Sequence, residues 1–307
     1  MISRILVIKL GALGDMVLAL GPFAAIRETY GDAHTTLLTT AAYAELMRAS
    51  PYFDEVWLDD RPSPWQPGRW LELRRHLRDG RFDFVFDLQT SDRSGWYYRL
   101  MGPGRRPDWS GIAPGCSHPH ANPSRDDQHT VARQIEQLAH AGITGVRPAD
   151  LSWVEGDETK FEVDRPYVLL VPGGAPHRPR KRWPTDRYIE LARELAKQGL
   201  GTVLLGGEDE RQLAEGIARA YPRIRNLAGQ TTFADIIGLA RGASGAVGND
   251  TGPMHLVAAA GCPGLVLFSD ESDPALTRPA GKSISVLQRD DLAMLATADV
   301  VDALSLR

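Results

Sequence analysis

A polar cluster precedes an apolar run in the C-terminal half of the chain. The stretch GNDTGPMHLVAAAGCP, residues 248–263, contains Asp250, Thr251, Gly252 and His255. If a helix begins here, its first turn offers unpaired backbone N–H groups and the positive end of the helix dipole, a combination that binds phosphate. Glycine lets the backbone approach an anion closely. The stretch therefore predicts a phosphate-binding turn between a strand and a helix.

The same residues have a structural explanation. Asp250 or Thr251 would cap the helix, and His255 would be a buried imidazole with satisfied hydrogen bonds. Capping alone does not require a histidine at this position, so the complete run favours a ligand-binding role.

A second loop is strongly basic. The stretch GGAPHRPRKRWP, residues 173–184, opens on Gly173 and Gly174 and continues with His177, three arginines and Lys181. Such positive charge is stabilised by an anion, and Lys or Arg would form charge-assisted hydrogen bonds with a diphosphate. A solvated loop is the alternative. Because no carboxylate pair suited to Mg²⁺ lies beside this loop, we expect side chains and a helix terminus to neutralise the leaving group, with no metal and no cofactor.

Two acidic residues stand beside glycine turns. Asp15 ends GALGD, residues 11–15, where the start of a helix would stabilise its ionised form, so Asp15 is either a base or a simple N-cap. Glu208 follows a strand in GGEDE, residues 206–210, where it would bind ribose hydroxyls or form the first turn of a helix. GALGD lacks the G-x-G-x-x-G fingerprint, which argues against a nicotinamide dehydrogenase.

The elements that must position these residues alternate between apolar strands and amphipathic helices. We predict strands at 4–10, 34–40, 54–60, 82–89, 167–174, 201–207, 245–250 and 263–269. We predict helices at 16–31, 41–50, 70–80, 129–143, 184–199, 208–221, 231–243 and 251–261, with Thr231 or Thr232 capping the seventh.

This alternation implies parallel sheets with right-handed crossovers, an α/β fold. A stretch with proline and acidic residues, 147–166, interrupts the rhythm, and 307 residues exceed the size of one core. We therefore expect two doubly wound, Rossmann-like domains, residues 1–160 and 161–307, that face a central cleft. Ligands bind beyond the carboxyl ends of strands in such sheets, which is where the loops described above lie.

Composition narrows the function classes. A net charge of -4 gives no general attraction to nucleic acid, and no apolar stretch reaches the length of about 20 residues that a membrane span needs. Two cysteines, Cys116 and Cys262, form neither a disulfide framework nor a metal signature, which favours a reducing compartment. We expect a cytoplasmic enzyme with at most peripheral contact with the inner-membrane surface.

Four motifs together resemble the heptosyltransferase family of glycosyltransferases, family 9. They are IKLGALGD (8–15), DLQTSDRS (87–94), PGGAPHRPRKRWPTDRY (172–188) and GNDTGPMHLVAAAGCP (248–263). The resemblance covers nearly the whole chain and implies the GT-B fold, with an acceptor-side N-terminal domain and a nucleotide-sugar-binding C-terminal domain. It also implies inverting, metal-independent transfer of a heptose from ADP-heptose to the lipopolysaccharide inner core.

The resemblance also assigns roles to residues. Asp15 matches the aspartate that deprotonates the acceptor hydroxyl, Lys181 the lysine on the donor phosphate, and Glu208 an acid on the ribose. Arg93 matches an acceptor-side contact. The remaining matches bind the donor, and they are Gly173, Gly174, Asp250, Thr251, Gly252 and His255.

Two further expectations concern the substrates. Pro253 and Met254 depart from the Leu-Ser or Leu-Met of many lipopolysaccharide enzymes, which leaves the exact sugar more open than the reaction. The alternatives are a family 9 transferase that uses another sugar nucleotide, a related GT-B epimerase, or a non-catalytic nucleotide-sugar-binding subunit. We expect the acceptor to be an anionic, lipid-linked saccharide. Five arginines of the first domain would contact it or membrane headgroups, or form ordinary solvated helix faces: Arg74, Arg75, Arg78, Arg105 and Arg106.

Overall fold

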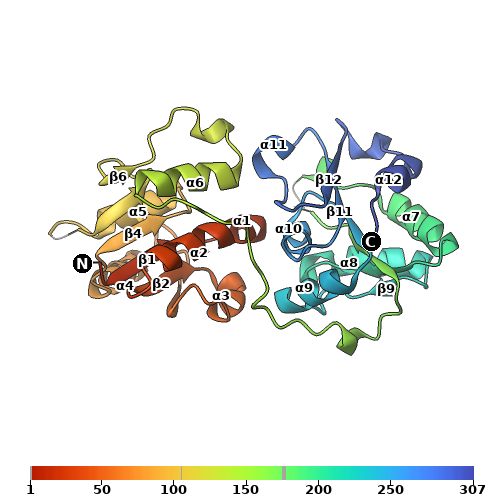
Figure 1. Ribbon diagram of the computed structural model, residues 1–307, viewed down its shortest axis with the longest axis horizontal. Coiled ribbons are helices and arrows are strands. Elements are labelled where there is room, and N and C mark those ends of the chain that lie inside the picture. Colours follow the sequence, from red (N-terminus) through yellow and green to blue (C-terminus); the bar gives the residue numbers. More distant parts are fainter. Residues whose placement is uncertain (1, 105, 175–177) are drawn as a thin grey trace. The chain divides into compact units, whose positions relative to one another are not determined.

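The computed structural model describes residues 2–104, 106–174 and 178–307 (Figure 1). Packing divides the chain into two compact units, Met1–Ala149 and Asp150–Arg307. The division lies before the boundary that the sequence suggests at residue 160. Arg241 explains the difference, because its guanidinium donates hydrogen bonds to the carbonyl oxygens of Val154 and Leu151 and so attaches this segment to the second unit.

The first unit contains six parallel strands in the order β3-β2-β1-β4-β5-β6. They are β1 Arg4–Ile8, β2 His34–Thr39, β3 Glu55–Leu58, β4 Phe84–Asp87, β5 Asp108–Gly111 and β6 His118–Pro119. β1 lies between β2 and β4, and its residues 5–8 are completely buried. A continuous apolar run suits such a strand, because helices cover both faces of the sheet.

The helices of the first unit connect these strands. They are α1 Leu13–Leu18, α2 Leu20–Thr29, α3 Ala41–Arg48, α4 Pro67–Asp79, α5 Asp92–Leu100 and α6 Thr130–His140, with a short 3₁₀ turn, η1 Arg125–Asp127. α2 packs beside α6, while α4 packs beside α5 (Figure 1). On the side of α4 and α5, Leu6 and Ile8 of β1 are buried in one hydrophobic core together with Leu73 and Tyr97.

Two predictions for the first unit are wrong in detail. The single helix expected at 16–31 is two helices, and the first begins at Leu13, so Asp15 lies inside its first turn. The segment treated as a loop after β4 contains the start of α5, because Ser91 accepts a hydrogen bond from the backbone of Ser94 and caps the helix. Arg93 therefore lies on a helix.

The second unit repeats the architecture with six parallel strands in the order β12-β11-β10-β7-β8-β9. They are β7 Tyr167–Val171, β8 Gly201–Leu204, β9 Arg225–Asn226, β10 Gly245–Asn249, β11 Gly264–Phe268 and β12 Ile284–Gln288. β10 is central, and all of its residues are buried. The two sheets confirm the predicted α/β fold.

The helices of the second unit are α7 Thr185–Lys197, α8 Arg211–Ala220, α9 Phe233–Gly242, α10 Gly252–Ala259, α11 Pro274–Thr277 and α12 Thr297–Ala303. Its 3₁₀ turns are η2 Thr159–Phe161, η3 Pro179–Lys181, η4 Glu208–Glu210 and η5 Leu292–Met294. Thr232, one of the two expected caps, begins α9, since its hydroxyl accepts from the backbone N–H of Asp235. α12 packs on α7, with Val300 buried in the core of this unit.

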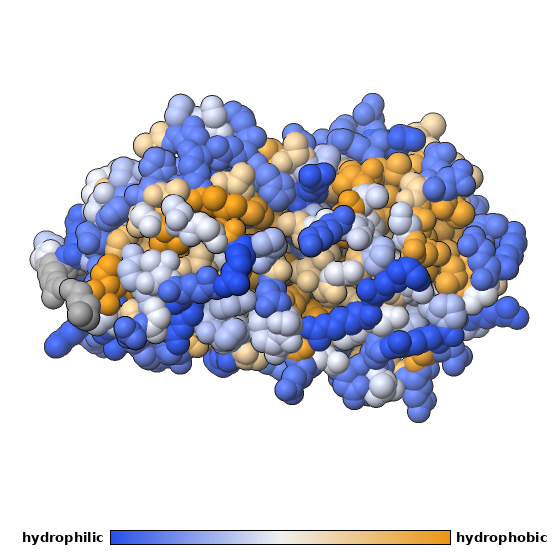
Figure 2. Space-filling model, viewed as in Figure 1, coloured by the Kyte–Doolittle hydropathy of each residue, from blue (hydrophilic) through white to orange (hydrophobic). Residues whose placement is uncertain are grey.

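Hydrophilic residues cover much of the face shown in Figure 2, with apolar residues visible between them on each unit. Among the described residues, no helix combines the length and the apolar character that crossing a membrane requires.

Candidate functional site

The polar cluster predicted from the sequence lies at the carboxyl end of β10. Lys181, the last residue of η3, forms an ion pair with Asp250, with Nζ 2.7 Å from Oδ2. The two side chains are only 12% and 9% exposed. Charges this sheltered need a partner, because removal from water is costly for each of them. The structure thus brings together two of the predicted donor-site residues.

Asn249, which the sequence analysis did not select, organises this edge of the sheet. Its Oδ1 accepts hydrogen bonds from the backbone N–H of Trp183 (3.0 Å) and from the hydroxyl of Tyr188 (3.1 Å). Its Nδ2 donates to the carbonyls of Pro172 (2.8 Å) and Gly173 (3.0 Å). One buried amide therefore holds both ends of the basic loop against β10. A buried Asn directly before the Asp-Thr-Gly turn was the available signal.

Thr251, Gly252 and His255 lie at the start of α10. Thr251 occupies the N-cap position, but its side chain does not cap the helix, and the Asp250 carboxylate binds Lys181. The prediction that one of these side chains caps α10 is therefore wrong. Because the first turn has no side-chain cap, its N–H groups can serve an anion. His255 is buried in this turn.

The basic loop finds acceptors within the protein. The Arg182 guanidinium donates to the carbonyl of Gly174, and Arg180 forms an ion pair with Asp270 at 2.7 Å. With the Lys181 pair, carboxylates therefore balance two of the four positive charges at positions 178–182, whereas His177 lies outside the described residues. A Cβ at Gly173 would lie 2.9 Å from Cγ of Glu210, so a larger residue there would require the Glu210 side chain to shift.

The acidic residues after β8 form the first helical turn that the sequence allowed, the 3₁₀ turn η4 that leads into α8. Glu210 accepts a hydrogen bond from the backbone N–H of Gly207 (2.8 Å), so it forms the capping contact. Glu208 begins this turn, is exposed, and pairs with Arg211 at 2.6 Å. A role of Glu208 in binding ribose hydroxyls stays a prediction.

In the first unit, Asp15 is the third residue of α1. Its Oδ2 accepts a hydrogen bond from the backbone N–H of Ala12 at 3.3 Å. The preceding strand ends at a buried lysine, Lys9, whose Nζ donates to the carbonyl of Leu88 (3.0 Å). Burial lowers the pKa of Lys9, and the charge of Asp15 opposes that shift. The buried lysine and the Asp15 carboxylate therefore attract each other.

A second buried group, Asp87, lies at the carboxyl end of β4. Its Oδ1 accepts hydrogen bonds from the backbone N–H groups of Gln89 (3.1 Å) and Thr90 (2.9 Å). Burial nevertheless raises the pKa of Asp87 to about 6. Neither Lys9 nor Asp87 was selected from the sequence, because a charged residue at the end of an apolar strand resembles an ordinary strand terminus.

Arg93 is held by contacts within its own unit. It donates hydrogen bonds to the carbonyl of Pro62 (3.2 Å) and the hydroxyl of Tyr97 (3.3 Å), and its guanidinium lies 5.5 Å from the centre of the Trp70 ring. These contacts fix the loop after β3 against α5. A role of Arg93 in contacting the acceptor stays a prediction.

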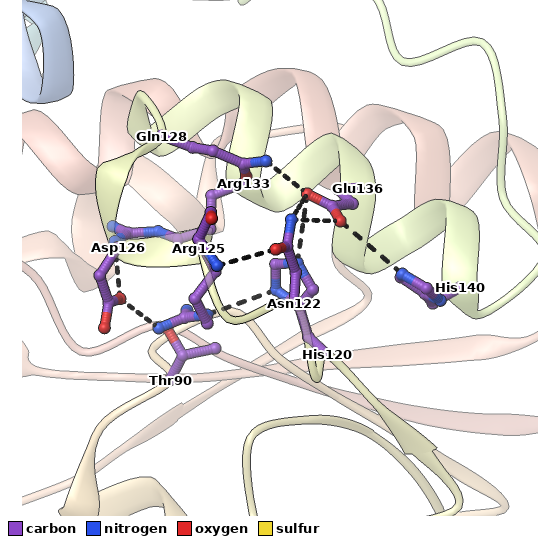
Figure 3. Close-up of polar contacts among 10 residues, drawn as sticks. Thr90, His120, Asn122, Arg125, Asp126, Gln128, Arg133, Glu136 and His140 are labelled. Carbon is purple, nitrogen blue, oxygen red and sulfur yellow. Dashed lines mark hydrogen bonds and ion pairs between the residues drawn. The ribbon is translucent and has the colours of Figure 1, made fainter.

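Figure 3 shows a polar network that the sequence analysis missed. Arg125 donates to Thr90 (3.0 Å) and forms an ion pair with Asp126 (2.8 Å), which Arg133 also approaches at 3.6 Å. The Asp126 side chain is 79% exposed, whereas the two guanidiniums are mostly sheltered. An anion that displaced Asp126 would meet both arginines. Arg125, Asp126 and Arg133 lie within nine positions of the chain, but they match no recognised binding motif, and Thr90 joins them from 35 positions away.

Where the structure describes the chain, no group of three or more His, Cys, Asp or Glu side chains is arranged to hold a metal ion.

Comparisons with known proteins place these features in a family. The model of glycosyltransferase family 9 (heptosyltransferase) matches residues 70–303. Lipopolysaccharide heptosyltransferase 2 of Escherichia coli is 26% identical over 93% of this chain and 88% of its own length, and lipooligosaccharide heptosyltransferase 2 of Haemophilus ducreyi is 24% identical over 94% and 89%.

Solved structures confirm the predicted GT-B fold. A family 9 glycosyltransferase from Veillonella parvula has a TM-score of 0.84 at 20% identity, covering 98% of this chain and 95% of that one. The ADP-heptose lipopolysaccharide heptosyltransferase II of Escherichia coli has a TM-score of 0.79 at 23% identity, covering 97% and 96%. With the family model matched over most of its length, this chain belongs to glycosyltransferase family 9 and is a glycosyltransferase.

Proposed function

We propose that this enzyme transfers a heptose from ADP-heptose to a saccharide of the lipopolysaccharide inner core, with inversion at the anomeric carbon and without a metal ion. The names of its relatives support the substrates, since they are heptosyltransferases of lipopolysaccharide or lipooligosaccharide. The ion pair between Lys181 and Asp250 at the uncapped start of α10 carries the proposal, because it supplies a positive group at a phosphate-binding turn.

On the donor side, charge develops on the diphosphate as ADP leaves. Lys181 and the first N–H groups of α10 would meet that charge, and preorganised groups of this kind lower a barrier by about 3 kcal/mol each. Asp250 keeps the lysine in place before the donor binds. Gly173 and Gly174 would bring backbone to the phosphates, and Glu208 would accept hydrogen bonds from the ribose.

The remaining donor-side residues have supporting roles. Gly252 leaves the approach to the α10 N–H groups open, because it has no side chain. Thr251 would donate its hydroxyl to the diphosphate or the sugar, and the buried imidazole of His255 would shape the same turn.

On the acceptor side, Asp15 would accept the proton of the attacking hydroxyl. The acceptor oxygen forms a bond to the anomeric carbon while the bond from that carbon to the phosphate oxygen breaks, and ADP leaves with the electron pair. Attack from the face opposite the leaving group inverts the configuration.

The acceptor that fits the first unit is anionic. Arg125 and Arg133 lie at the carboxyl edge of its sheet and share one exposed carboxylate, Asp126. An acidic sugar or a phosphate would replace that carboxylate and gain two charge-assisted hydrogen bonds. Arg93, near the same edge, would contribute to the acceptor side through the loop that it holds.

The direct test is a transfer assay with ADP-heptose and a deacylated inner-core saccharide in the presence of a chelator. The expected product carries one added heptose by mass spectrometry, and NMR shows inverted anomeric configuration. A parallel thermal-shift series with ADP-, UDP-, GDP- and CMP-sugars identifies the nucleotide, because stabilisation follows affinity. Stabilisation by UDP-sugars alone, with no heptose transfer, contradicts the proposal.

A further inference from the structure

The helices α4 and α5, with the segment that precedes α4, expose an unusual amount of apolar surface. Among the described residues, four of the seven large apolar side chains that are exposed lie here, and the segment from 58 to 96 contains them all: Leu58, Trp65, Leu71 and Trp96. Trp65 is 89% exposed and Trp96 53%. Tryptophan is seldom this exposed on a monomeric surface, and a cluster of such residues indicates an interaction site.

One of these side chains, Trp96, lines a groove of about 500 Å³ between the two helices. Its lining is Pro64, Trp70, Arg93, Trp96 and Leu100. Arg99 lies 4.6 Å from the ring centre of Trp96, and Arg93 lies 5.5 Å from that of Trp70. The surface therefore interleaves aromatic rings with guanidinium groups, which suits a partner that has apolar and negatively charged parts side by side.

The charge of this surface is opposite to that of the whole protein. The two helices carry six arginines against three carboxylates, although the chain has a net charge of -4. A second groove of about 370 Å³ lies near the C-terminal end of α4. Its lining includes Arg78, Arg81, Phe82 and Met101. Guanidinium groups at both ends of the surface are complementary to phosphates.

The aromatic groove lies at the same edge of the sheet as Asp15. Helices α4 and α5 begin after β3 and β4, hence at the carboxyl edge of this parallel sheet. Arg93 of the groove donates to the carbonyl of Pro62, and Arg61 donates to the carbonyl of Leu10 in the turn that leads to Asp15. The groove and the turn are thus joined through one short loop.

We propose that this α4–α5 face docks on an anionic phospholipid bilayer and thereby presents a lipid-linked acceptor to Asp15. The tryptophans enter the interfacial region, and the arginines bind headgroup phosphates. A bilayer fits better than a nucleic acid, because the exposed groups include leucines as well as rings. The docking is inferred from the composition of the surface alone, whereas delivery of the acceptor to Asp15 rests on the proposed function.

The experiment measures sedimentation of the full chain with vesicles of phosphatidylglycerol and phosphatidylcholine, and with phosphatidylcholine alone. Two double variants test the surface: Trp65→Ala with Trp96→Ala, and Arg75→Glu with Arg99→Glu. Met294→Ala and Arg223→Glu are matched controls, since both residues are exposed on the second unit. Binding to the anionic vesicles should fall at least about tenfold for the tryptophan pair and about twentyfold for the arginine pair, and both controls should bind as wild type.

Two transfer assays separate this inference from the proposed function. The tryptophan variant should lose activity on acceptor embedded in anionic vesicles while its kcat/KM on a deacylated, water-soluble acceptor stays within about twofold of wild type. Vesicle binding that is equal for wild type and both double variants, or equal on the two vesicle types, overturns the docking surface. If wild type binds anionic vesicles in the expected way but transfers no heptose to the soluble acceptor, the docking stands and the proposed function fails.

Discussion

Lys181 and Asp250, 69 positions apart in the chain, form a nearly buried ion pair at the start of α10. The lysine arrives on η3 and the aspartate follows β10, and Asn249 holds the intervening loop in register with that strand. The pair places a cation at a phosphate-binding turn. While no ligand is bound, the Asp250 carboxylate balances the charge of the lysine.

Lys181→Met should lower kcat/KM by about 10²- to 10³-fold, because it removes a group that meets charge on the leaving diphosphate. It also leaves Asp250 buried without its cation, which costs about 3 kcal/mol or more in unfolding free energy. Steady-state kinetics and urea unfolding measure the two effects.

Asp250→Asn in the Lys181→Met background separates stability from catalysis. The double variant should recover much of the unfolding free energy while the activity stays low. Lys197→Met is the control, since this lysine pairs with Glu194 on an exposed part of α7. Recovery of activity in the double variant would show that Lys181 serves the fold and not the donor.

Asp15→Asn should reduce kcat by about 10³-fold, since the amide cannot accept the acceptor proton. Isothermal titration should find ADP affinity within about twofold of wild type, because Asp15 belongs to the first unit and the proposed nucleotide contacts to the second. Asp32→Asn, an exposed aspartate of the first unit, is the control. Turnover near that of wild type would remove Asp15 from the mechanism.

Asn249→Ala should lower the unfolding free energy by about 2–4 kcal/mol, because it leaves several buried polar groups without partners. The loop that it holds carries Gly173 and Lys181, so the Kd for ADP should rise as well. Asn226→Ala is the matched control, since the Asn226 side chain accepts one backbone hydrogen bond, from Ala228. Equal losses of stability in the two variants would contradict the organising role of Asn249.

The fold could be predicted from the sequence to a large extent, because a buried parallel strand such as β1 or β10 requires a continuous apolar run and leaves a clear pattern. The start of α5 was missed because its cap, Ser91, follows a turn, and because one glycine and three aromatic residues weaken the helical signal. The helix forms despite its weak local helix propensity, because Tyr97 packs in the hydrophobic core.

The candidate site was predictable where one motif holds several groups, as in the run from Asp250 to His255. It was not predictable where function depends on pairing in space. The capping expected of Asp250 or Thr251 failed: the Asp250 carboxylate binds a lysine from another loop, and the Thr251 side chain forms no cap. Arg125 and Asp126 share the turn η1, and Arg133 approaches them from α6, a pairing that depends on how the turn packs against the helix.

Asp87→Asn should stabilise the protein near neutral pH. Burial raises the pKa of Asp87 to about 6, above the ordinary value of 3.8, so the folded state holds this proton more tightly than the unfolded chain does. Stability from this group is therefore complete below about pH 4 and falls as the pH rises to about 6. A shift of this size corresponds to about 3 kcal/mol at pH 7, and the amide removes that cost while still accepting hydrogen bonds from Gln89 and Thr90.

Urea unfolding at about pH 4 and about pH 7 measures this difference directly. The variant should exceed wild type at neutral pH and approach it in acid. Asp83→Asn offers a contrast, because Asp83 lies at the start of the same strand and accepts hydrogen bonds from Ser3 near the surface. If Asp87→Asn destabilised the fold equally at both values of pH, the folded protein would hold Asp87 as a carboxylate that the nearby Lys9 ammonium stabilises. The buried position of Lys9 would then depend on Asp87.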